Sequence, residues 1–227
     1  TEHLGDYDLL ALQYLWGVPG SLPTTGSSVS VNSSSTTASY FNDTISLDVN
    51  AFNSSTQVNG LAGTDELVIN VASSKASFQP SLQQFTYTKA DGSFAGVFLN
   101  SVERVRFTDK SVALDIDGNA GQAFRLYKAA FDRTPDKSGL GYWLNQMDNG
   151  TSLKAVAQGF VSSNEFVALN GVNPTSTQLA TSLYKHVLGR TPDQVGLAYW
   201  VGQLDSNSMT RSAVLMGFSE STENQIA

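Results

Sequence analysis

The chain has 227 residues, 41% of them apolar, which is enough for one large domain or for two smaller ones with separate cores. Cysteine is absent, and this excludes disulfides, thiol catalysis and cysteine-ligated metal sites. The net charge of −7 arises in the first third, because residues 1–74 carry seven acidic side chains and neither Lys nor Arg. An acidic chain repels phosphate groups, so we expect neither nucleic acid nor an anionic membrane as partner. We also expect no membrane insertion, because no stretch reaches the ~18 consecutive apolar residues of a span.

Two segments precede the first clear strand pattern. Within residues 1–20, apolar side chains recur at helical spacing from position 6 to 16 and are followed by Gly and Pro, which predicts one short helix. Residues 21–44 are rich in Ser and Thr, with twelve of them in the nineteen positions from 21 to 39. This composition predicts either a linker or weak strands at the surface.

Residues 45–118 predict a β domain. Several short runs alternate between apolar and polar side chains, and Asp91-Gly92 and Asp109-Lys110 are typical hairpin turns. We therefore expect a small, mostly antiparallel sheet, packed as a sandwich or a roll. The predicted strands cover residues 66–71, 84–88, 96–99, 102–107 and 111–116.

Residues 119–227 contain one 23-residue phrase twice, 57 residues apart, in two repeats of about 120–170 and 177–227. Apolar spacing predicts three helices and a short fourth segment in the first repeat, and three helices in the second. The fold class is therefore α+β, a β domain followed by an all-α domain of two three-helix repeats. The phrase runs from Leu126-Tyr127-Lys128 through Arg133-Thr134-Pro135-Asp136 to Tyr142-Trp143, and again from Leu183-Tyr184-Lys185 through Arg190-Thr191-Pro192-Asp193 to Tyr199-Trp200.

The repeated phrase has a structural explanation. In each copy the Pro ends one helix, the following Asp caps the next, and the Arg is placed to pair with that Asp across the turn. Aromatic residues at helical spacing are typical of a core, so we expect Tyr142-Trp143 and Tyr199-Trp200 to anchor the two repeats.

The same residues carry a family resemblance. The pattern of Leu-Tyr, Arg-x-Pro-Asp, Gly-Leu-x-Tyr-Trp, Phe and Ser-x-Glu covers about 100 residues and resembles a duplicated helical domain of unknown function, similar to phycobilisome linker domains. That module recurs in large secreted bacterial proteins, and the segment from Val102 to Gly121 resembles the β segment that precedes it in type I-secreted proteins. The resemblance implies an extracellular or cell-surface location and a role in anchoring or assembly.

A shorter resemblance lies at the N-terminus. Residues 7–17 resemble the helix that closes the catalytic domain of serralysin-type metalloproteases. It implies a parent protein with a protease-like domain upstream. The His-Glu-x-x-His zinc helix of those enzymes has no match in this sequence, so their activity is not carried over.

The most plausible metal site in the sequence is a calcium loop. Asp115, Asp117 and Asn119 place oxygen side chains at alternate positions around Gly118, similar to the first half of a calcium loop. The bidentate acid expected at loop position twelve is missing, since Leu126 stands there. The alternative is that Asp117 or Asn119 caps the helix beginning near residue 120.

A second candidate for calcium is Asp65. The segment from Gly60 to Val68 fits the repeat of calcium β-rolls except at Leu61, but it occurs once, and roll sites take ligands from successive turns. The alternative is a tight turn leading into a strand.

The sequence contains little that indicates a catalytic site. Only His3 and His186 are available as imidazoles, without metal-ligand spacing, and no Gly-x-Ser-x-Gly elbow accompanies a Ser-His-Asp triad through His186. We therefore expect a non-catalytic extracellular module, which anchors, assembles or displays a secreted bacterial protein. Its expected partners are surface polysaccharide, lipopolysaccharide or further copies of itself. The alternative is a non-catalytic accessory region of a secreted metalloprotease, which would serve export, calcium-dependent folding or substrate binding.

Overall fold

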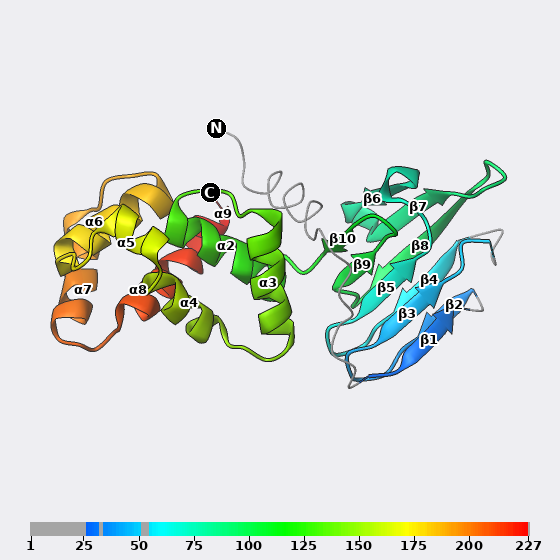
Figure 1. Ribbon diagram of the computed structural model, residues 1–227, viewed down its shortest axis with the longest axis horizontal. Helices are drawn as coiled ribbons and strands as arrows, with labels where there is room; N and C mark the ends of the chain where they lie inside the picture. The colour runs from blue at the N-terminus through cyan, green and yellow to red at the C-terminus, as the bar shows by residue number, and fades with distance from the viewer. Residues whose placement is uncertain (1–25, 32–33, 51–54, 227) are drawn as a thin grey trace. The chain divides into compact units, whose positions relative to one another are not determined.

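The computed structural model describes residues 26–31, 34–50 and 55–226. These form two compact units that meet in sequence between Ile116 and Asp117. The first unit contains the strands and the second the helices, so the predicted α+β class is confirmed (Figure 1). The helix predicted over residues 6–16 lies outside the described residues. In the described part of the chain, no helix is long and apolar enough to cross a membrane.

Strands of the first unit form two five-stranded sheets, with the orders β1-β3-β5-β9-β10 and β2-β4-β8-β7-β6. The Ser- and Thr-rich segment supplies β1 and β2. Short 3-10 turns over Ser73–Lys75 and Pro80–Leu82 flank β6. The strands are β1 (Ser28–Val31), β2 (Ser35–Thr37), β3 (Thr44–Leu47), β4 (Thr56–Asn59), β5 (Glu66–Ile69), β6 (Ala76–Gln79), β7 (Gln84–Thr88), β8 (Phe94–Asn100), β9 (Arg104–Arg106) and β10 (Ser111–Ala113).

The chain winds as a roll of stacked coils. The first two coils give one strand to each sheet, the third gives β5 to the first sheet and β6, β7 and β8 to the second, and β9 and β10 return to the first sheet. The pairs β1-β3, β3-β5 and β5-β9 are parallel in the first sheet, as are β2-β4 and β4-β8 in the second. The expectation of a mostly antiparallel sheet is therefore wrong. Alternation with period two reveals a half-buried strand but not its partner. From β1 to β6, and again from β8 to β9, the connection leads to the opposite sheet instead of back along the same one.

Antiparallel pairing is confined to β6-β7, β7-β8 and β9-β10 among the described strands. Both predicted hairpin turns are confirmed. Gly92 has a φ of 83° between β7 and β8, and the N–H of Phe107 donates to the carbonyl of Lys110 at 2.8 Å between β9 and β10. The first hairpin places β8 next to β4, so it completes the third coil.

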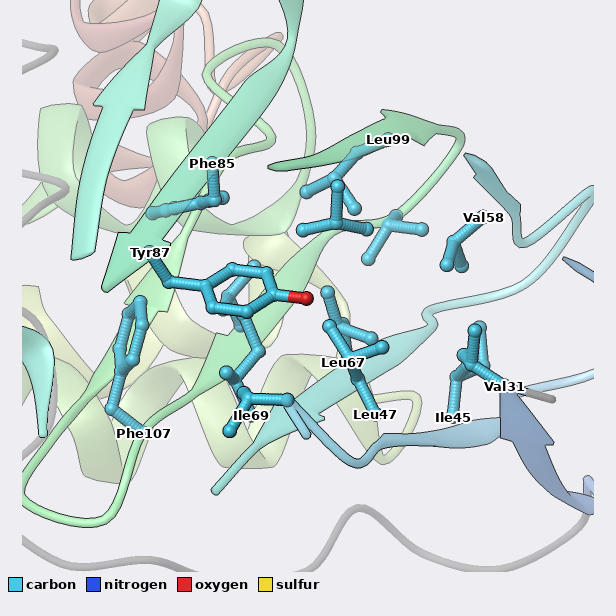
Figure 2. Close-up of a cluster of buried hydrophobic side chains, with 14 of the residues drawn as sticks. Val31, Ile45, Leu47, Val58, Leu67, Ile69, Phe85, Tyr87, Leu99 and Phe107 are labelled. Atoms are coloured by element: carbon cyan, nitrogen blue, oxygen red, sulfur yellow. The ribbon is translucent and has the colours of Figure 1, made fainter. Parts of the chain in front are cut away.

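The core of the β unit lies between the two sheets. Val31, Ile45, Leu47, Leu67 and Ile69 face inward from the first sheet and are at most 4% exposed. The second sheet contributes Val58, Phe85, Tyr87, Val97 and Leu99. Figure 2 shows Tyr87 at the centre of this cluster, where burial raises the pKa of its hydroxyl.

Helices of the second unit follow the two predicted repeats, with α2 to α5 in the first and α6 to α9 in the second. The prediction of three helices in the second repeat misses α9, a five-residue helix at its end. Helix α8 packs against α2 and α4, and α6 packs against α7, so the repeats share one core. The helices are α2 (Asn119–Phe131), α3 (Lys137–Asp148), α4 (Leu153–Val161), α5 (Asn164–Asn170), α6 (Ser176–Leu188), α7 (Gln194–Asp205), α8 (Arg211–Ser219) and α9 (Thr222–Ile226).

The expected aromatic anchors are only partly correct. Tyr142 and Tyr199 are 58% and 55% exposed, so they do not belong to the core. Trp143 and Trp200 are half-buried and lie against Phe160 and Phe218, with ring centroids 5.1 and 4.9 Å apart. Adjacent residues on a helix point about 100° apart, so a Tyr-Trp pair cannot place both rings on the buried face.

Candidate functional site

The repeated phrase forms the same polar cluster in both helical repeats. In the first repeat, the Arg133 guanidinium lies 5.0 Å from the ring centroid of Tyr127 and donates from Nη2 to the Tyr127 hydroxyl at 3.0 Å. That hydroxyl donates to Asp136 Oδ2 at 3.0 Å, and Asp136 Oδ1 accepts from the N–H of Gly139 at 2.7 Å. Arg133 Nε also donates to Glu165 Oε1 at 2.6 Å, which ties the turn after α2 to α5.

The second copy repeats the contacts among the Arg, Asp and Glu side chains and the stacking of the Arg on the Tyr ring. Arg190 lies 4.8 Å from the ring centroid of Tyr184 and donates from Nη2 to Glu223 Oε2 at 2.9 Å. Asp193 caps α7 through the N–H of Gly196 at 2.8 Å and lies 3.5 Å from Arg190 Nη1. The predicted cap and the predicted Arg–Asp pairing are therefore confirmed in both copies.

The acid of each Ser-x-Glu was not predicted as the arginine's partner. Glu165 and Glu223 lie about thirty residues beyond Arg133 and Arg190, yet their carboxylates form the shorter ion pairs. The sequence did contain a signal for this pairing, because a glutamate occurs at the matching position of both repeats. These contacts hold the pKa of Asp136 well below its usual range, chiefly through the hydrogen bond from Gly139, and the Arg190 side chain lowers the pKa of Glu223. The cluster stabilises helix ends and leaves no reactive group.

The structure gives the predicted calcium residues other partners. Asp115 forms an ion pair with the buried side chain of Arg104, and the Asn119 amide donates to Asp148 Oδ1 at 2.9 Å. Asp117 is exposed. The capping alternative is wrong in its detail, because the N-cap of α2 is Gly118 and no side chain caps it.

Asp65 belongs to a ladder of acids at the turns that lead into the first sheet. Register places Asp43, Asp65 and Glu103 at equivalent positions, directly before β3, β5 and β9. Each carboxylate accepts a hydrogen bond from the preceding coil: Ser27 N–H to Asp43 Oδ1 at 2.5 Å, Asp43 N–H to Asp65 Oδ1 at 2.8 Å, and Asp65 N–H to Glu103 Oε2 at 2.8 Å. The acids therefore join successive coils where the turns offer no strand partner.

The ladder places Asp65 in an unfavourable electrostatic environment. Burial, together with repulsion from Glu103 and Asp43, raises the pKa of Asp65 to about 7, although the hydrogen bond from Asp43 lowers it. Its Oδ2 is buried and has no hydrogen-bond partner among the described residues. In that part of the chain, no group of three or more His, Asp or Glu side chains is arranged to hold a metal ion. Calcium at Asp65 therefore remains a prediction.

A serine and an aspartate do lie beside His186. Its Nδ1 is 3.3 Å from Ser182 Oγ, and its Nε2 is 3.9 Å from Asp132 Oδ2. However, the Ser182 hydroxyl donates its proton to Asn170 Oδ1 at 2.7 Å. A catalytic serine must instead donate to the imidazole that acts as its base. The three side chains therefore form a contact between the helical repeats, without an activated hydroxyl.

The outer faces of the two sheets differ in charge. On the first, Arg106 pairs with Glu66 at 2.9 Å beside a shallow hollow of about 510 Å³, which Asp48 and Asn70 also line. On the second, no outward-facing residue of the five described strands is charged. We call this second surface the uncharged face; it consists of Ser35, Thr37, Gln57, Asn59, Phe94, Phe98, Asn100, Gln84, Thr86, Thr88, Ser77 and Gln79.

Comparison with known proteins matches the helical unit, but not the β unit, to a protein family. Residues 122–170 and residues 157–227 each match one family model, described as a domain of unknown function (DUF4214). The helical unit is therefore a tandem helical domain of that kind, as the repeated phrase predicted. Searches of curated proteins and of solved structures gave no significant match.

Proposed function

We propose that this chain is a non-catalytic binding module that attaches a secreted bacterial protein to the cell surface. The observation that carries the proposal is the uncharged face, a solvent-exposed sheet surface of hydroxyl, amide and aromatic side chains. A surface without charge has no means of attracting an ionic partner, but it can form many neutral hydrogen bonds.

The helical unit supports the same proposal. Its repeated Tyr, Arg, Asp and Glu side chains are occupied with one another, and its His186 contacts a serine that is not activated. The module matches a tandem helical domain, and the resemblance to secreted bacterial proteins favours an extracellular location. In this proposal the helical unit is a stable carrier, and the β unit makes the contact.

Sedimentation with isolated bacterial envelopes tests the proposal. The full chain should pellet with the envelopes in a saturable way, and high salt should leave the bound fraction unchanged, because salt screens interactions between charges only. An unrelated protein of similar net charge serves as control. If the chain stays in the supernatant at every envelope concentration, the proposal is wrong.

A further inference from the structure

We propose that the uncharged face binds neutral polysaccharide, with Phe98 as the platform on which a sugar ring stacks. This inference deepens the proposed function and rests on it for its biological setting. Register aligns one row of side chains across all five strands of the second sheet. From edge to edge the row is Ser35, Gln57, Phe98, Gln84 and Gln79.

The row provides an aromatic surface flanked by amides. Phe98 lies on the central strand and is 40% exposed, although it is a large apolar side chain. Gln57 lies beside it on one neighbouring strand and Gln84 on the other. With strands spaced about 4.8 Å apart, the row spans about 19 Å, which suits several sugar units of an extended chain.

Gly96 leaves space for one of these amides. A Cβ atom at Gly96 would lie 2.6 Å from Gln84 Nε2 and 3.1 Å from Ser55 Oγ. The missing side chain therefore lets the Gln84 amide lie over Gly96 of the neighbouring strand, and Gln84 is 9% exposed. A side chain that is already confined by burial loses little conformational entropy when it binds a ligand.

The chemistry of the row favours a neutral sugar chain. Amides and hydroxyls both donate and accept hydrogen bonds, which matches the hydroxyl groups of a sugar. The face of an aromatic ring is electron-rich and attracts the C–H groups on one side of a sugar ring. Because the strand residues of this face bear no charge, a polyanion gains no attraction there.

Other partners fit the row less well. A stable protein interface needs an apolar core, and the uncharged face has two apolar side chains, Phe94 and Phe98, among ten polar ones. Nucleic acid requires cations opposite its phosphates, which the outward-facing side chains of these five strands lack. A second copy of the chain would meet the same polar surface, so it would bury little apolar area.

Native gels that contain a dissolved polysaccharide test the proposal on the full chain. The gels hold hydroxyethylcellulose, galactomannan, laminarin or dextran, with alginate as the anionic comparison. We expect retardation in at least one neutral gel and none in alginate. Phe98→Ser should weaken that binding about tenfold, as loss of an aromatic anchor does. Gln57→Ala should weaken it less, because the hydrogen bond of one neutral amide contributes less.

Tyr199→Ser is the matched control, because it removes a 55% exposed aromatic ring from the helical unit and should leave retardation unchanged. Circular dichroism confirms that each variant is folded. The proposal is wrong if no neutral polysaccharide retards the chain, if alginate retards it equally, or if folded Phe98→Ser and Gln57→Ala bind like the parent chain. Light scattering that shows a dimer dissociated by Phe98→Ser would assign the face to a second copy and also overturn the proposal.

The envelope assay separates this inference from the proposed function. If Phe98→Ser still pellets with envelopes as the parent chain does, attachment stands but the uncharged face is not its site. If the parent chain binds a neutral polysaccharide through Phe98 but does not pellet with envelopes, the polysaccharide site stands and surface attachment fails.

Discussion

Position 196 has no room for a side chain, because even a Cβ atom would clash with Tyr184. A Cβ atom there would lie 2.1 Å from the hydroxyl of Tyr184, the same hydroxyl that packs against the capped start of α7. In the first repeat, Gly139 stands in the same relation to Tyr127, at 2.9 Å. The glycine of each Gly-Leu-x-Tyr-Trp pattern is therefore needed for space rather than for backbone freedom.

We predict that Gly196→Ala destabilises the helical unit by about 1–3 kcal/mol, because crowding outweighs the better helix propensity of Ala. Gly202→Ala is the matched control in the same helix, since nothing lies within 4 Å of its added Cβ. It should stabilise the protein by up to about 1 kcal/mol. Urea unfolding measures both changes, and equal effects of the two variants would contradict this explanation.

Asp65 predicts a pH dependence whose sign is unusual for a carboxylate. Its pKa of about 7 in the folded state exceeds the usual value of 3.8, so the folded state holds the proton more tightly than the unfolded state does. The stability that Asp65 contributes is therefore fully present below about pH 4 and is lost as the pH rises through 7.

Asp65→Asn should consequently raise the melting temperature at pH 8, and this gain should shrink as the pH falls below 7. Asp43→Asn is the comparison. Burial alone would raise the pKa of Asp43, but the hydrogen bonds from Ser39 and Ser27 lower it. That variant should therefore be destabilised at neutral pH, and the loss should shrink in acid. Thermal unfolding from pH 4 to 8 checks both, and a gain from Asp65→Asn that persists at pH 4 would contradict the assignment.

At the scale of elements, two ion pairs join helices of the second unit, and one pair is much more buried than the other. Arg125 in α2 bonds to Glu220 after α8 at 2.6 Å, and their side chains are 7% and 23% exposed. The pair of Arg133 with Glu165 is 40% and 45% exposed. Burial makes loss of one partner costly, whereas an exposed pair is screened by water and salt.

We expect Arg125→Met to destabilise the helical unit by about 2–4 kcal/mol, because Glu220 keeps its charge in a largely buried place. Glu165→Gln, the exposed counterpart, should cost less than about 1 kcal/mol, and high salt should reduce that cost. Guanidinium is itself a salt, so the comparison needs urea. A larger loss in Glu165→Gln than in Arg125→Met would contradict the ranking.

At the scale of the whole molecule, the prediction that Asp115, Asp117 and Asn119 bind calcium has still to be tested by experiment. At the predicted loop Asp115 already pairs with Arg104, and the residues that the structure describes include no group of three or more His, Asp or Glu side chains arranged to hold a metal ion. We therefore predict that millimolar calcium and a chelator give the same melting temperature and the same mass by light scattering. A calcium-dependent rise in melting temperature that Asp117→Asn abolishes would instead establish the loop as a calcium site.

Much of the helical unit could be predicted from sequence. Asp136 and Asp193 cap their helices. Apolar spacing predicts helices that match α2 to α8 to within two residues at every end; they cover residues 121–131, 139–148, 152–160, 165–170, 177–188, 196–204 and 210–218. The candidate sites were harder to predict. Gln57, Gln84 and Phe98 are distant in sequence, and only strand register brings them into one row. Their surroundings carry no motif, so the sequence offered no signal for them beyond an absence of charge.

The sequence by itself determined helices α2 to α8, the caps of α3 and α7 and the α+β class, because those features depend on residues only a few positions apart. It also determined the two repeats, because the same residues recur 57 positions apart. The tertiary structure decided the parallel winding of the β unit, the ladder of Asp43, Asp65 and Glu103, and the pairing of each arginine with a distant glutamate. It also decided which of the Tyr-Trp rings are buried. These features depend on which segments become neighbours in space, and periodicity along the chain does not encode that choice.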